Sequence, residues 1–144
     1  MTHTATAILD LEKVKKLFEE AAPAYQSAHP YPFGFFDDFL ENDAARAAMR
    51  AFPGVKDDGW IHYVHVNEKK HGLNKMDMIP ADLQEVIKAL NSDEFVAALS
   101  SLTGIPNLKP DPSLEGGGLH QSKRGGFLNI HADFTVHPHK RHWR

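Results

Sequence analysis

The sequence predicts an α+β fold in which helices dominate residues 1–106 and strands dominate residues 107–144. Three observations lead to this prediction. Apolar residues recur at helical spacing in the first part, proline and glycine separate the helical stretches, and aromatic and β-branched residues gather at residues 60–66 and again near residue 130. Because 144 residues suffice for one hydrophobic core, we expect a single domain over residues 1–144.

The chain begins with a predicted amphipathic helix. Over residues 8–22 apolar side chains recur every three or four positions, which places Val14 and Phe18 on one face. Pro23 follows and predicts the end of this helix. The apolar run FFDDFL at residues 35–40 predicts either a short strand or the start of another helix.

A second helix and the clearest strand of the first half come next. Residues 43–52 form the predicted helix, with Asn42 as its cap and Pro53 after its end. The stretch WIHYVHV, residues 60–66, is rich in aromatic and β-branched side chains, which favours a strand. The polar stretch NEKKHGLNK, residues 67–75, predicts an exposed turn.

Two further helices complete the helical part. Pro80 suits the first turn of a helix that runs to Leu90. Ser92 can cap the following helix, and Gly104 is placed to close it. A loop then leads into LHQSKRGGFLNIHADFTVHP, residues 119–138, whose strand-like content is interrupted by a Gly-Gly pair.

Composition limits the expected partners and location. No apolar run approaches the roughly 18 residues of a membrane span, and the N-terminus lacks the features of a secretory signal, so we expect no membrane partner. Zero cysteines exclude disulfides and thiolate metal sites and favour a reducing cytoplasmic location. The net charge of -3 includes a basic excess over residues 121–144. No nucleic-acid-binding motif accompanies that excess, and we expect no nucleic-acid partner.

His131 and Asp133 are the strongest candidates for a functional site. A bare His-x-Asp pattern arises about once by chance in a chain with 10 histidines, so its context matters. On an extended segment, residues two apart point to the same side, and both side chains can then face one metal ion. Imidazole and carboxylate are two of the three ligands in the 2-His-1-carboxylate triad of Fe(II) oxygenases. The alternative is a histidine at a strand end beside an aspartate that caps a loop.

The stretch GGGLHQSKRGGFLNIHADFTVHP, residues 116–138, resembles the metal-binding region of Fe(II)/2-oxoglutarate-dependent oxygenases of the prolyl 4-hydroxylase-like kind. In that family a strand runs into His-x-Asp-Phe, often after a turn that contains glycine. The stretch PFGFFDDFLENDAARAAM, residues 32–49, is similar to the N-terminal part of the same domain. The resemblance covers most of residues 31–138 and is specific over residues 116–138.

The resemblance implies a double-stranded β-helix (a jelly roll) with helices packed outside one sheet. It implies Fe(II) held by His131 and Asp133, 2-oxoglutarate as cosubstrate, and hydroxylation of a small molecule or an amino-acid side chain. It also implies a distal histidine and a basic residue that binds 2-oxoglutarate, neither of which can be placed after Asp133. We therefore expect this chain to be the N-terminal part of the domain, with its C-terminal half missing and little or no activity alone.

Asn129 is a candidate for contact with the cosubstrate, because it lies two positions before His131 on the same side of the strand. It could equally be a polar residue of the barrel interior. The family often has a tyrosine in the region that Gln121, Ser122 and Lys123 occupy here. Two other functions remain open: a non-catalytic binding module on the same scaffold, and a His-rich protein that binds divalent metal through residues 131–142, HADFTVHPHKRH.

Overall fold

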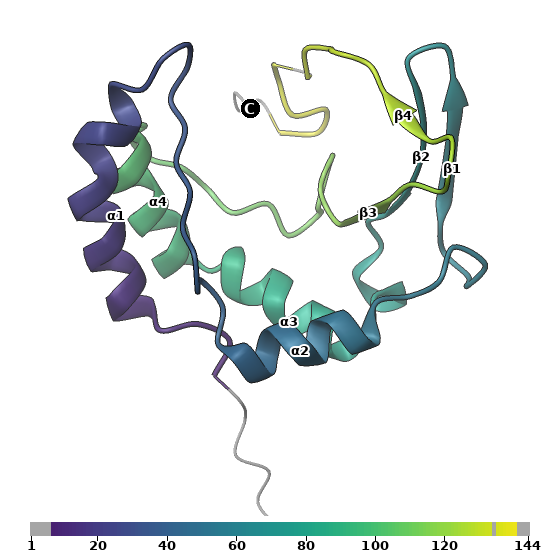
Figure 1. Ribbon diagram of the computed structural model, residues 1–144, viewed down its shortest axis with the longest axis horizontal. Helices are drawn as coiled ribbons and strands as arrows, with labels where there is room; N and C mark the ends of the chain where they lie inside the picture. The colour runs from purple at the N-terminus through teal and green to yellow at the C-terminus, as the bar shows by residue number, and fades with distance from the viewer. Residues whose placement is uncertain (1–6, 134, 141–144) are drawn as a thin grey trace, which may run out of the picture. The chain divides into compact units, whose positions relative to one another are not determined.

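The computed structural model describes residues 7–133 and 135–140, which form two compact units (Figure 1). One unit is drawn from Met1–Phe52 and Pro80–Pro112, and the other from Pro53–Ile79 and Ser113–Arg144. The α-helices of the described residues belong to the first unit and the strands belong to the second. The α+β class predicted from the sequence is confirmed.

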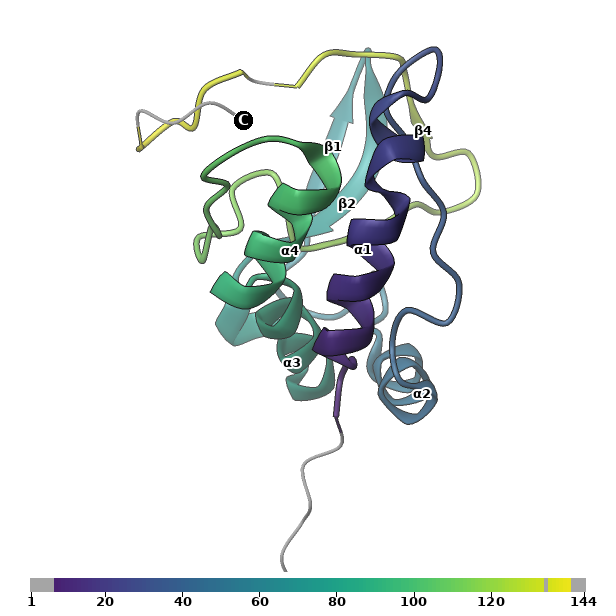
Figure 2. The ribbon, with the colours of Figure 1, turned by 90° about the vertical axis from the view of Figure 1, so that its left-hand side faces the viewer.

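The helical unit contains four α-helices within the described residues: α1 (Leu11–Gln26), α2 (Asn42–Ala51), α3 (Ala81–Leu90) and α4 (Asp93–Thr103). Helices α1 and α4 lie side by side (Figures 1 and 2). Their shared core is centred on Phe18, which is only 3% exposed. The Phe18 ring contacts three other phenylalanine rings at centroid distances of 5.1 to 6.0 Å, those of Phe36, Phe39 and Phe95.

The predicted caps of α4 are confirmed. The Ser92 hydroxyl accepts a hydrogen bond from the Phe95 amide at 3.2 Å, and Gly104 ends the helix with φ of 71°. The predicted bounds of α2 and α3 are also close to those observed. The prediction that Asn42 caps α2 is wrong, because Asn42 is the first residue of the helix and Glu41 precedes it without a side-chain cap bond. At residues 35–40 neither a strand nor a helix forms, and Phe36 and Phe39 of this segment instead pack on the core of α1 and α4.

The predicted end of α1 at Pro23 is wrong, because the helix continues to Gln26 with Pro23 inside it. Proline removes one helical donor, but its own carbonyl still accepts from the backbone amide and the hydroxyl of Ser27, at 3.2 and 2.8 Å. The Gln26 side chain also donates to the Leu102 carbonyl at 3.0 Å, which ties the last turn of α1 to α4. The Gln26–Leu102 contact joins residues 76 positions apart, so the local sequence pattern cannot indicate it.

The sheet unit contains β1 (Ile61–His65), β2 (Glu68–Leu73), β3 (Leu119–Gln121) and β4 (Phe127–Leu128), with a short 3-10 helix at Met76–Met78. All pairings are antiparallel. Strand β2 is central: β1 pairs along its whole length, while β3 and β4 pair with different ends of it. This described sheet is small and open, so the structure establishes the α+β class and no closed barrel.

The prediction of an exposed turn at residues 67–75 is wrong, because most of this stretch is β2. The turn is confined to Val66 and Asn67. The first three residues of β2, Glu68, Lys69 and Lys70, are all charged, so the stretch lacks the alternation of apolar and polar residues that predicts a strand. Lys70 Nζ forms an ion pair with Glu68 Oε2 at 2.8 Å. The fully buried Leu73 packs at the other end of the strand. Strand formation here depends on partners that lie elsewhere in the sequence.

Two glycines allow β3 and β4 to approach β2 closely. Gly118 has φ of 94°, and a Cβ atom there would overlap the Leu73 carbonyl oxygen. At Gly126 a Cβ atom would lie 2.9 Å from the Lys69 carbonyl oxygen. The Gly-Gly interruption predicted from the sequence therefore separates two short strands of the same sheet.

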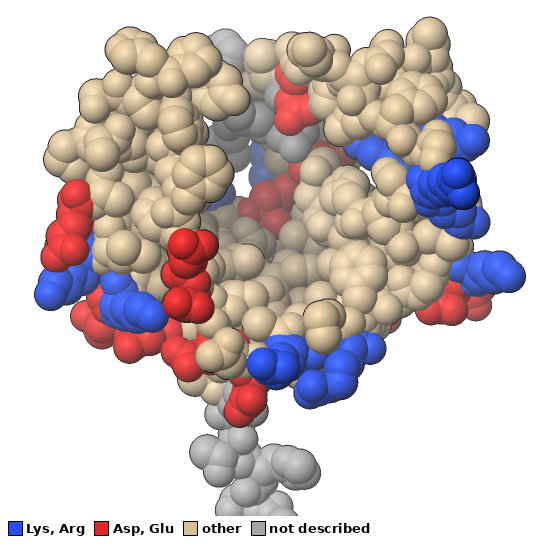
Figure 3. Space-filling view, in the orientation of Figure 1, with Lys and Arg blue, Asp and Glu red and all other residues tan. Residues whose placement is uncertain are grey.

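The surface of the sheet unit is basic on one side. Figure 3 shows Lys and Arg side chains gathered over the part of the sheet where β1 and β2 lie. Lys69 of β2 is exposed, as are Lys123 and Arg124 in the connection from β3 to β4. No helix within the described ranges has the length and apolar character needed to cross a membrane.

Candidate metal centre

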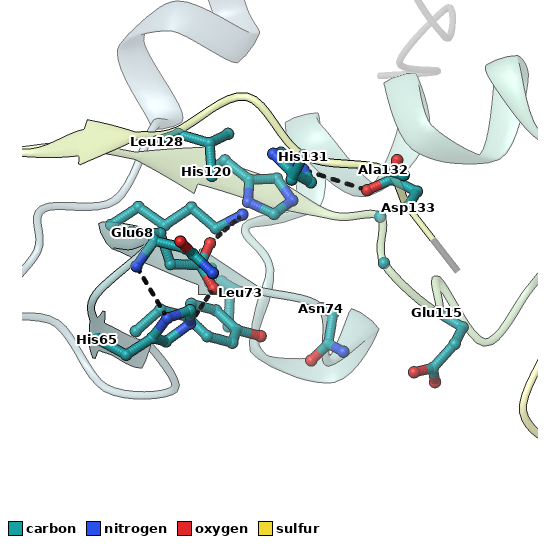
Figure 4. Close-up of a pocket in the computed structure, with 16 residues that line it drawn as sticks. His65, Glu68, Leu73, Asn74, Glu115, His120, Leu128, His131, Ala132 and Asp133 are labelled. Atoms are coloured by element: carbon teal, nitrogen blue, oxygen red, sulfur yellow. Dashed lines mark hydrogen bonds and ion pairs between the residues drawn. The ribbon is translucent and has the colours of Figure 1, made fainter. Parts of the chain in front are cut away.

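One face of the sheet forms the floor of a cavity of about 480 Å³ (Figure 4). Because side chains alternate along a strand, the cross-strand register places Tyr63, His65, Glu68, Lys70 and His120 on this face. The segment that follows β4 lines the same cavity and includes His131, Ala132 and Asp133. The volume lies within the range of roughly 300–1,000 Å³ that is usual for small-molecule sites.

Asn129 connects the segment after β4 to the turn between β1 and β2. Its backbone amide donates to the Asn67 carbonyl at 2.8 Å, and its side-chain amide donates to the Val66 carbonyl at 3.3 Å. The side chain is thus bonded to the hairpin, and Asn129 is not among the described residues that line the cavity. Its observed contacts position the chain immediately before His131.

The structure brings His131 and Asp133 together, as the extended spacing predicts. His131 Nε2 lies 3.3 Å from Asp133 Oδ1 (Figure 4), and His131 Nδ1 lies 2.7 Å from the Asn129 carbonyl oxygen. A carbonyl oxygen only accepts, so Nδ1 carries the proton and donates. In the neutral ring, Nε2 then bears the lone pair on the side of the Asp133 carboxylate.

This pair fits two adjacent ligands of one metal ion. Ligand atoms at about 2.1 Å and at right angles around an octahedral ion lie about 3 Å apart. A metal-bound histidine also usually donates its other ring N–H to a carbonyl or carboxylate, as His131 does to Asn129. The same two atoms also fit a direct ion pair when the ring is protonated. No group of three or more His, Asp or Glu side chains in the described ranges has metal-binding geometry.

The other histidines near the cavity differ in what their nitrogens can do. His65 Nε2 lies 2.7 Å from Glu68 Oε1, and its Nδ1 accepts from the Asn67 amide at 3.4 Å. Both nitrogens of His65 are therefore engaged within the hairpin. His120 lies on the cavity face of β3, opposite Gly72 of β2. A glycine there leaves room for the Tyr63 and His120 rings, which both lie near its missing side chain.

Glu68 organises the charged part of the cavity floor. Its carboxylate, whose side chain is 14% exposed, accepts from Lys70 Nζ at 2.8 Å and from His65 Nε2 at 2.7 Å. The hydrogen bond from Lys70 holds the pKa of the Glu68 carboxyl below its usual value, and His65 adds to this effect. Lys70 Nζ also lies 5.5 Å from the centre of the Tyr63 ring.

Sequence reasoning missed Tyr63, Glu68 and Lys70 as cavity residues. Their alternation in residues 61–65 and 68–73 becomes visible only when the two segments are paired as a hairpin. The turn pair Val66-Asn67 contains no glycine and has no positive φ, so it lacks the short-range signal that usually marks a two-residue hairpin.

The histidine-rich segment after Asp133 is arranged differently from a metal site. His137 is buried, and its Nδ1 accepts from the backbone amides of His139 and Lys140, each at 3.1 Å. That nitrogen is therefore used in a local turn. The His137 and His139 rings lie 6.1 Å apart, centre to centre. His142 and Phe134 lie outside the described residues.

No protein-family model matches the chain, and no curated protein or solved structure matches it either. Function is therefore inferred from the residues of the cavity and from the resemblance of residues 116–138.

Proposed function

We propose that this chain is the N-terminal part of a non-haem Fe(II)/2-oxoglutarate-dependent dioxygenase with an incomplete jelly-roll core. The proposed reaction is hydroxylation of a small molecule or an amino-acid side chain in the reducing cytoplasm. The observation that supports it most is the pair of possible ligand atoms at the cavity, His131 Nε2 and Asp133 Oδ1, which lie 3.3 Å apart. His131 Nδ1 also donates a hydrogen bond to the Asn129 carbonyl, as a metal-bound histidine usually does.

The residues of the chain have distinct parts in this proposal. His131 and Asp133 hold the metal, and the Asn129 carbonyl fixes the orientation of the His131 ring. The cavity floor around Tyr63 and Lys70 offers polar and aromatic contacts to a small substrate. Bound Fe(II) with 2-oxoglutarate would supply the oxidising chemistry. Two protein ligands hold a metal less firmly than three, so we expect weak metal binding and no turnover by this chain alone.

A titration with Mn(II), a redox-stable substitute for Fe(II), tests the proposal. Electron paramagnetic resonance of free Mn(II) reports affinity without requiring activity. We expect His131→Ala and Asp133→Ala each to weaken binding by about tenfold or more, because each removes one of two ligands. His120→Ala removes a different cavity histidine and serves as the matched control, with little change expected. Undiminished affinity in both ligand variants would falsify the proposal.

The same titration separates the alternatives. A non-catalytic binding module would show no Mn(II) affinity that depends on His131 or Asp133. A His-rich metal binder would lose Zn(II) affinity on His139→Ala, and would keep it on His131→Ala. We do not expect this second outcome, because His137 Nδ1 already accepts hydrogen bonds from the backbone amides of His139 and Lys140.

A further inference from the structure

Strand β1 is an edge of the described sheet. It pairs with β2 on one side, and no other described strand pairs with its second side (Figure 1). Hydrogen-bonded and non-hydrogen-bonded pairs alternate along an antiparallel ladder, starting from the bonded pair His65 and Glu68 at the two-residue turn. Backbone groups of residues 61, 63 and 65 therefore face β2. Those of His62 and Val64 face outward.

This edge lacks the features that usually protect an exposed strand. Natural edge strands carry lysine, proline, a bulge or an inward-pointing charge, which discourage pairing with another chain. The five residues of β1, IHYVH, include no Lys, Arg, Asp, Glu or Pro, and they pair with β2 in an uninterrupted register. The side chain of Val64 is 70% exposed. The strand is thus open to pairing along its whole length.

We propose that β1 pairs antiparallel with β1 of a second copy of this chain, about a two-fold axis through Tyr63. In this register His62 lies opposite the partner's Val64, and Val64 lies opposite the partner's His62. Both residues of each pair direct their N–H and C=O groups outward, so each donor meets an acceptor. The same surface serves both copies, as a closed two-fold contact requires.

The charge pattern favours this register. An axis through His62 would place two histidines directly opposite each other and would shorten the overlap of the strands. With the axis at Tyr63, no histidine of one copy faces a histidine of the other. The nearest exposed lysine, Lys69, lies on β2. It is separated from the partner's Lys69 by about three strand spacings, or about 14 Å, which exceeds the Debye length of about 8 Å at physiological salt.

The proposed contact also reaches the cavity. Tyr63 lies on the cavity face of the sheet and lines the cavity. In the proposed dimer it lies beside the partner's Tyr63, so the cavities of the two copies lie on either side of the paired β1 strands. The inference is independent of the proposed oxygenase function, because it depends only on the β1–β2 hairpin.

Sedimentation equilibrium over a wide range of protein concentration tests the dimer. We expect a reversible monomer–dimer equilibrium in the unaltered chain. Val64→Pro removes an outward N–H and leaves the bonds to β2 intact, and we expect it to weaken dimerisation by about tenfold or more. Val64→Lys places a charge at the same edge and should act likewise. Met49→Lys adds the same charge at an exposed apolar residue of α2 and should leave the equilibrium unchanged.

Disulfide trapping tests the register, because the chain has no native cysteine. Under oxidation Tyr63→Cys should form a covalent dimer, since directly opposed residues in a non-hydrogen-bonded pair have Cα atoms about 4.5 Å apart. His62→Cys should link far less, because its partner copy lies diagonally, at about 7–8 Å. Circular dichroism confirms that each variant is folded. A chain that is monomeric at every concentration, a dimer that Val64→Pro leaves intact, or equal linkage of the two cysteine variants would overturn the proposal.

Discussion

The carbonyl oxygen of Asn129 lies 2.7 Å from Nδ1 of His131, while the Asn129 side chain donates to the turn between β1 and β2. One residue thus joins the end of β4 to the hairpin and sets the direction of the His131 ring. The candidate metal centre is therefore coupled to the sheet through a residue that does not itself line the cavity.

Asn129→Ala should weaken Mn(II) binding by about fivefold. The backbone carbonyl that orients His131 remains, but the side-chain bond that holds it in place is lost, so the effect should be smaller than removal of a ligand. Asn74→Ala, which removes an amide from the cavity wall, serves as the control. If Mn(II) affinity is unchanged and only 2-oxoglutarate affinity falls, Asn129 contacts the cosubstrate instead.

The stability of the protein should fall as the pH is lowered below 6.5, in part because of His71. Burial lowers the pKa of His71 from its ordinary value of 6.5, and the nearby charges of His62 and Lys123 lower it further. Its Nδ1 is enclosed and has no hydrogen-bond partner, and its ring contacts that of His62 at 4.6 Å. Between the lowered pKa and 6.5, the unfolded chain binds more protons than the folded chain.

Protonation of His71 therefore destabilises the folded state progressively as the pH falls from about 6.5 towards the lowered pKa, and it has no effect above this range. Urea unfolding measured from pH 8 to pH 5 checks this expectation, with His71→Gln as the comparison. The difference between the two curves isolates His71 from other histidines. The pH range in which His71 titrates lies above the acid range in which Glu68, whose pKa is lowered, loses its contribution to the free energy of unfolding. Parallel curves for the two proteins would contradict the prediction.

Gly118→Ala should destabilise the sheet unit by more than about 2 kcal/mol. The new Cβ atom would overlap the Leu73 carbonyl oxygen, and the positive φ of 94° adds backbone strain. Gly125→Ala is a matched control, because its φ of 79° is also positive but nothing lies within 4 Å of the new atom. It should cost only the backbone term of about 1 kcal/mol. Chemical denaturation of the two variants measures the steric part by difference.

Phe18→Ala should destabilise the helical unit by about 3–5 kcal/mol, because it removes the ring at the centre of four packed phenylalanines. Phe35→Ala is the matched control, since this ring is 88% exposed. Its effect should stay within about 0.5 kcal/mol. Far-ultraviolet circular dichroism during urea unfolding follows the helices directly. Equal effects of the two substitutions would show that Phe18 does not anchor this core.

Much of the local structure was predictable because the relevant signals are short-range. The cap at Ser92, the closing glycine at Gly104 and the strand at residues 60–66 each follow from a few neighbouring residues. The proximity of His131 and Asp133 is of the same kind, since an extended backbone alone brings alternate side chains to one side.

Features that depend on distant partners were not predictable in this way. The stretch EKKHGL reads as polar and exposed, yet it forms the central strand because β1, β3 and β4 satisfy its backbone and Glu68 pairs with Lys70. Helix α1 continues past Pro23 because Gln26 reaches the Leu102 carbonyl. By itself the sequence determined the caps of α4, the first strand and a candidate pair of metal ligands. Only the tertiary structure decided the central strand and the charged cavity floor, because hydrogen bonds and ion pairs between remote segments leave no periodic pattern in either segment alone.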